Sequence, residues 1–93
     1  MATRILLIER LESRPGIASF AARCHEGTLH LGDKLQSAVD PEGRHHAIDV
    51  TCVEIAWTRD LLVDELDENF GGRVDFTGPD VSSLSAGWTL SNE

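Results

Sequence analysis

The stretch FAARCHEGTLHLGD, residues 20–33, carries the strongest fold signal in this chain of 93 residues. In its first half apolar and polar positions alternate, so that Phe20, Ala22 and Cys24 share the inward face of a strand predicted over 17–25. Gly27 then turns the chain, and Gly32 marks a tight bend soon afterwards. Short strands punctuated by glycine are typical of an all-β sandwich or barrel.

The same punctuation continues on both sides of this stretch. Further strands are predicted over residues 4–11, 34–39, 46–57, 73–77 and 88–90, with 61–63 as a short strand or an extended link. Helical periodicity is absent except around residues 61–66. In the long strand the apolar phase slips at Val53 and continues through Ile55 and Trp57, which predicts a β-bulge. We therefore predict an all-β fold, a small closed antiparallel β-barrel of six to seven strands, because closure removes exposed sheet edges.

The order of these motifs resembles domain 2, the β-barrel, of the elongation factor Tu-like translation GTPases. Residues 20–33 are similar to the family's strand followed by Gly, Thr-Leu and Gly-Asp, and VTCVEI, residues 50–55, looks like its Val-Thr-x-Val-Glu strand. The acidic turn and glycine-containing strand of 64–78 and the closing SAGWTL of 85–90 follow in the family's order. The resemblance implies one translation-factor domain 2 barrel over residues 1–93.

No Gly-x-x-x-x-Gly-Lys-Ser/Thr phosphate loop occurs in these residues, so we expect a stand-alone domain without the GTPase domain. In elongation factor Tu the barrel helps to hold the aminoacylated 3′ end of tRNA. The resemblance places such a pocket at Glu9, Arg10 and Glu54, although Arg10 replaces an acid and Glu12 replaces an aromatic residue. The residues alone leave Glu54 a second interpretation, an outward-facing strand residue beside the bulge.

Charge narrows the partners that the domain could bind. The net charge is −8 and the eight basic residues are scattered, which disfavours a large phosphate footprint and an anionic membrane. We therefore expect neither DNA nor membrane binding, while a small pocket for one nucleotide end remains compatible. Five acids follow the long strand and form either a solvated loop or a surface for a basic partner: Asp60, Asp64, Glu65, Asp67 and Glu68.

No metal, cofactor or catalytic centre is expected. Cys24, Cys52 and the four histidines lack the closely spaced pairs of a zinc site, and both cysteines fall on inward faces. His45 and His46 flank a hairpin turn and are predicted to be exposed. No Gly-x-Ser-x-Gly elbow is present, so an enzyme is disfavoured. Trp57 and Trp88 are either partner anchors or packing residues.

The chain shows neither a signal-peptide core nor a membrane span, and a cytoplasmic location is expected. The preferred hypothesis is a non-enzymatic binding module that contacts a partner protein through a barrel face or the acidic loop. The alternative is a translation accessory that binds a tRNA 3′ end or ribosomal RNA. The oligomeric state stays open.

Overall fold

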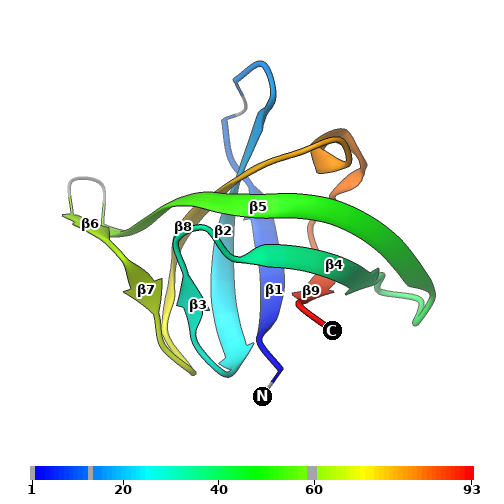
Figure 1. Ribbon diagram of the computed structural model, residues 1–93, viewed down its shortest axis with the longest axis horizontal. Coiled ribbons are helices and arrows are strands. Elements are labelled where there is room, and N and C mark those ends of the chain that lie inside the picture. The colour runs from blue at the N-terminus through cyan, green and yellow to red at the C-terminus, as the bar shows by residue number, and fades with distance from the viewer. Residues whose placement is uncertain (1, 13, 59–60) are drawn as a thin grey trace.

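The structure is a computed structural model that describes residues 2–12, 14–58 and 61–93 (Figure 1). Its strands are β1 (Arg4–Arg10), β2 (Ile17–Glu26), β3 (Leu29–His30), β4 (Lys34–Val39), β5 (His45–Thr58), β6 (Leu61–Val63), β7 (Glu65–Leu66), β8 (Gly71–Thr77) and β9 (Thr89–Ser91). A single 3-10 turn in the described residues, η1 (Val81–Ser83), precedes β9. Among the described residues, no helix is long and apolar enough to cross a membrane.

Antiparallel pairing closes the sheet into a ring. The strands are hydrogen-bonded in the order β4-β9-β1-β2-β8-β5, and β5 pairs back with β4. The long, curved β5 spans the molecule in Figure 1 and carries β6 on its far end. β3 and β7 form a separate two-stranded sheet, and the segment 61–66 consists of the two short strands β6 and β7 rather than a helix. The predicted closed antiparallel barrel is confirmed.

The core fills the inside of this ring. Phe20, Cys24, Val50 and Phe76 come from β2, β5 and β8, and all four side chains are fully buried, as the alternation predicted. Burying an apolar side chain of this kind stabilises a fold by about 1.5–3 kcal/mol. The inward-facing residues of β2 therefore contribute to the core that stabilises the closed ring.

Two bulges set which side chains reach the outer face. In β5, Cys52 pairs with Phe76 and Glu54 with Asp75, so Val53 is the extra residue and the predicted bulge is confirmed. The predicted apolar phase beyond it is correct only for Ile55, because Val53 and Trp57 are exposed. A second register shift after Ala56, against β6, takes Trp57 out of the core phase.

The second bulge lies in β1 and was not predicted. Leu7 pairs with Ala22 and Glu9 with Ala21, so Ile8 is the extra residue of β1. Its side chain is 53% exposed although it belongs to an apolar run. Without this extra residue Glu9 would stand opposite Phe20 and face the core, so the bulge turns Glu9 towards the outside of the ring, beside Ile8.

Candidate binding face

The outer face of β2, β8 and β5 brings together residues that are far apart in the sequence. The strand register places Ser19, Asp75 and Glu54 in one row across this face. The bulge at Val53 makes this row possible. Without the extra residue Val53 would stand opposite Asp75, and Glu54 would take the next, core-facing position.

Asp75 faces outward in this row, yet its side chain is 0% exposed because other side chains cover it. Ser19 Oγ donates to Oδ1 at 2.6 Å, and Arg14 Nη2 donates to Oδ2 at 3.1 Å. Arg73 Nη1 donates to the same Oδ2 at 2.7 Å, while its Nη2 donates to Glu54 Oε2 at 3.0 Å. Within the described residues, no buried side-chain nitrogen or oxygen lacks a hydrogen-bond partner.

These contacts fix the guanidinium of Arg73. Burial by itself would lower the pKa of Arg73, but the hydrogen bonds and charges of Glu54 and Asp75 outweigh it, and the pKa is raised. The group is therefore permanently charged and held from two sides. Arg73 acts as a rigid wall on the outer face rather than as a mobile surface side chain.

An apolar hollow of about 590 Å³ lies on one side of Arg73. Its walls include Ile8 and Leu11, and its floor is made of small residues such as Ala56 and Gly72. Trp57 stands at its rim, 47% exposed, and stacks on Phe70 with a centroid distance of 6.0 Å. Exposed apolar and aromatic side chains gathered around a hollow are typical of an interaction site.

Gly72 keeps the floor of this hollow flat. A Cβ atom at this position would lie 2.5 Å from the backbone oxygen of Ala56, on the neighbouring strand β5. Because that neighbour is backbone, it cannot move aside without disturbing the β5–β8 pairing. The close approach of the two strands therefore requires glycine here.

A polar hollow of about 440 Å³ lies on the other side of Arg73. Leu11 and Arg73 line both hollows, so the two share a wall. The polar hollow is also lined by Glu12, Arg14, Ser19 and Glu54. Together with the covered Asp75, three carboxylates face two guanidinium groups, which leaves one negative charge in excess.

The structure unites only part of the pocket that the resemblance implied. Glu54 lies in the polar hollow, and Glu9 lies exposed on the same outer face, opposite Ala21. Arg10 points elsewhere: its guanidinium carbon lies 5.0 Å from the centroid of the Phe20 ring. Its Nη2 also donates to the carbonyl oxygen of Leu84 at 2.8 Å, so Arg10 covers one end of the barrel.

The acidic cluster lies around β7, away from the lining of both hollows. Its described members are all exposed: Asp64, Glu65, Asp67 and Glu68. Glu65 Oε2 lies 3.2 Å from His30 Nε2, and Glu68 Oε1 accepts a hydrogen bond from the backbone N–H of Gly27 at 3.3 Å. These contacts join β7 to β3 and to the turn after β2. Asp60 lies outside the described residues.

The cysteines and histidines are dispersed. Cys24 and Cys52 are free and buried, as predicted, and burial raises both pKa values, that of Cys52 to about 12. The prediction of exposure holds for His45 but is wrong for His46, which is half-buried because its ring stacks on Trp88 at 4.6 Å. In the described part of the chain, no three His, Cys, Asp or Glu side chains are arranged to hold a metal ion.

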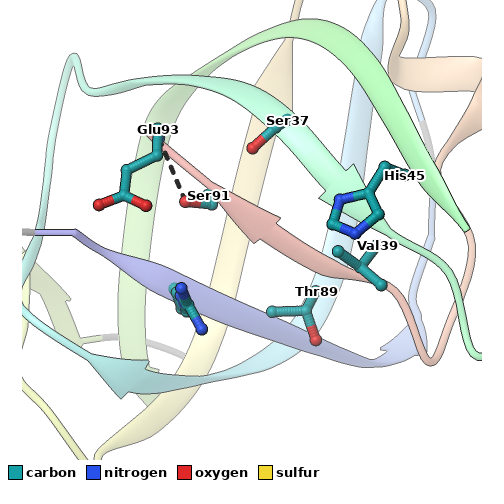
Figure 2. Close-up of a pocket in the computed structure, with 7 residues that line it drawn as sticks. Ser37, Val39, His45, Thr89, Ser91 and Glu93 are labelled. Atoms are coloured by element: carbon teal, nitrogen blue, oxygen red, sulfur yellow. Dashed lines mark hydrogen bonds between the residues drawn. The ribbon is translucent and has the colours of Figure 1, made fainter. Parts of the chain in front are cut away.

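A further groove of about 550 Å³ lies over β4, β9 and β1 (Figure 2). Figure 2 shows short hydroxyl side chains along its floor, Ser37, Thr89 and Ser91, with His45 and Val39 at one end. Its one guanidinium, on Arg4, is already paired with Glu26 at 3.2 Å. The outer face around Arg73 combines an apolar hollow with fixed charges, and we therefore take it as the candidate site.

Comparison with known proteins identifies the fold. No protein-family model matches the sequence, and no match is found among curated proteins. Translation elongation factor SelB from Methanococcus maripaludis matches in its apo form with a TM-score of 0.76, 14% identity and 98% of this chain covered. The same factor in complex with the GTP analogue GppNHp gives the same values. The chain has the domain 2 fold of the translation GTPases.

GDP-bound aIF5B from Aeropyrum pernix shares this translation-factor fold, with a TM-score of 0.64, 13% identity and 97% of this chain covered. The fold that the motif order implied is thereby confirmed. The chain spans only 19% of the length of SelB and 14% of that of aIF5B. At identities this low the likeness establishes the fold alone.

Sequence reasoning missed Asp75 and Arg73, which organise the face. A signal was present, because aspartate is depleted in strands and Asp75 stands between the apolar Val74 and Phe76. Such a residue needs a partner when covered, and Arg73 lies on the same face two positions earlier. No comparable signal in the sequence indicates that Arg14, in the turn before β2, also bonds to Asp75.

Proposed function

We propose that this chain is a non-enzymatic binding module, related to translation by its fold, that contacts a partner protein through the outer face of β1, β2, β8 and β5. The single observation that supports this most is the apolar hollow beside Trp57. Its walls carry Ile8 at 53% exposure on a chain of net charge −8. Aromatic and apolar anchors around a concave site are what protein interfaces use.

The chemistry of the face favours binding over catalysis. Both thiols are buried with raised pKa values, which disfavours them as nucleophiles. Arg73 donates hydrogen bonds to both Asp75 and Glu54, so these charged groups support the shape of the face. The acidic balance disfavours a long phosphate backbone as ligand. We propose a cytoplasmic location for this activity.

A quantitative capture experiment tests the proposal. The purified domain is immobilised and exposed to nuclease-treated lysate of its host, and bound proteins are compared between wild type and Ile8→Ser. Leu31→Ser is the matched control, because Leu31 is another exposed apolar residue but does not line the hollow. The proposal expects a protein whose recovery falls at least about fivefold with Ile8→Ser and is unchanged by the control. Equal recovery with all three forms would overturn it.

A second candidate function is the binding of a tRNA 3′ end or ribosomal RNA. It is favoured by the translation-factor fold together with Glu54 lying in a polar hollow that adjoins an apolar one. It predicts salt-sensitive binding in a tRNA titration, weakened by Glu54→Ala. The absence of any shift at low salt would exclude this candidate.

A further inference from the structure

We propose that the partner segment is extended and presents an apolar residue and, two positions away, a lysine or arginine. The apolar side chain enters the hollow beside Trp57, and the cation enters the hollow lined by Glu12 and Glu54. This inference rests on the proposed function, because it names the chemistry of the segment that the same face binds.

The spacing follows from the shared wall. Leu11 and Arg73 line both hollows, so only one layer of side chains separates them. In an extended chain, residues i and i+2 point to the same side and lie about 6.6 Å apart. Two same-side side chains of one strand can therefore straddle Arg73 and fill both hollows together.

The positive charge proposed for the residue in the polar hollow follows from the charged side chains that line this hollow. Arg14 and Arg73 are both paired with Asp75, and Arg73 also with Glu54. No ion pair among the described residues involves Glu12, whose side chain is exposed. A cation would pair with Glu12 and with the Glu54 carboxylate, whose Oε2 is bonded to Arg73, whereas an acid would meet two carboxylates. A second copy of this chain is disfavoured as occupant, because each copy carries a net charge of −8.

Titration of the ¹⁵N-labelled domain with short capped peptides tests the inference by NMR. The probes are acetyl-Gly-Leu-Ser-Arg-Gly-amide, its Arg-to-Glu analogue and its Leu-to-Ser analogue. The first peptide is expected to shift the Trp57 indole and the Gly71 and Gly72 amides, which report the apolar hollow, and the Ser19 and Glu54 amides, which report the polar one. Its Kd is expected to be at least about fivefold lower than that of either analogue.

Variants separate the charge effect from the apolar one. Glu12→Gln is expected to reduce the preference for Arg over Glu to below about twofold, and raised salt to do the same. Glu42→Gln, an exposed acid in the hairpin turn between β4 and β5, is the matched control and should leave the preference unchanged.

Each outcome decides the inference. Equal affinity for the Arg and Glu peptides, with shifts at the apolar hollow, overturns it and leaves the proposed function standing. Shifts from none of the peptides at millimolar concentration overturn it as well, and the capture experiment with Ile8→Ser then decides the proposed function separately. A tRNA acceptor-stem oligonucleotide that shifts both hollows while the peptides do not would assign the face to RNA.

Discussion

Replacing Asp75 by asparagine tests the organisation of the face most severely. The amide has nearly the shape of the carboxylate, and its oxygen can still accept from Ser19 Oγ. Its NH₂ group, however, would face the donors of Arg14 and Arg73, which now bond to Oδ2 at 3.1 and 2.7 Å. Two charge-assisted hydrogen bonds are lost, and two guanidinium groups lose their shared counter-charge.

The expected loss of stability follows from burial. Removing one partner of a fully buried ion pair costs about 3–5 kcal/mol. Here only Asp75 is fully covered, whereas the side chains of Arg14 and Arg73 are 60% and 30% exposed and can regain water. We therefore expect Asp75→Asn to lower the free energy of unfolding by about 2–3 kcal/mol, which is roughly 10–20 °C in Tm for a domain of this size.

Urea unfolding followed by circular dichroism, with equal m-values for wild type and variant, measures this loss. Arg14→Gln is the control, because its mostly exposed guanidinium should contribute only about 0–1 kcal/mol. A loss below about 1 kcal/mol for Asp75→Asn, no larger than that of the control, would refute the reasoning that the covered carboxylate holds the face together.

The remaining predictions concern Gly72, Cys52 and Arg10. Gly72→Ala should lower the free energy of unfolding by about 1–3 kcal/mol because its Cβ meets the Ala56 carbonyl, and Gly71→Ala, whose nearest neighbour lies at 3.3 Å, should cost less. Cys52, with a pKa of about 12 against 9.0 when exposed, should resist Ellman's reagent at pH 8 until urea is added. Rapid labelling of the native protein would contradict this prediction. Because the thiol of the unfolded chain has the lower pKa and loses its proton first, the free energy of unfolding should fall as the pH rises from about 9 towards 12. Arg10→Ala should cost about 1 kcal/mol through its contacts with Phe20 and Leu84, yet leave peptide binding unchanged.

The strands could be predicted because their signals are local. The alternation through Phe20, Ala22 and Cys24 fixes the inward face of β2, and the phase slip at Val53 marks its bulge. The bulge at Ile8 gives no such slip, because Ile8 continues an apolar run. β3 and β7, of two residues each, are too short to show any periodicity.

The site could be predicted only in part, because its signals are distant. The Val-Glu motif singles out Glu54, and the alternative interpretation, a strand residue beside the bulge, also describes its position. The cover over Asp75 joins residues that are 56 and 61 positions away in the sequence, Ser19 and Arg14. Which acid they cover is decided by strand register, and a single sequence contains no signal for pairing at that distance.

Photo-crosslinking in living cells tests the central claim most directly, with p-benzoylphenylalanine in place of Trp57 or, as control, of the exposed Gln36 on β4. The account predicts that position 57 yields a discrete adduct that survives ribonuclease and is destroyed by protease, and that position 36 does not. Equal adducts at both positions, or an adduct at position 57 that ribonuclease removes, would contradict it.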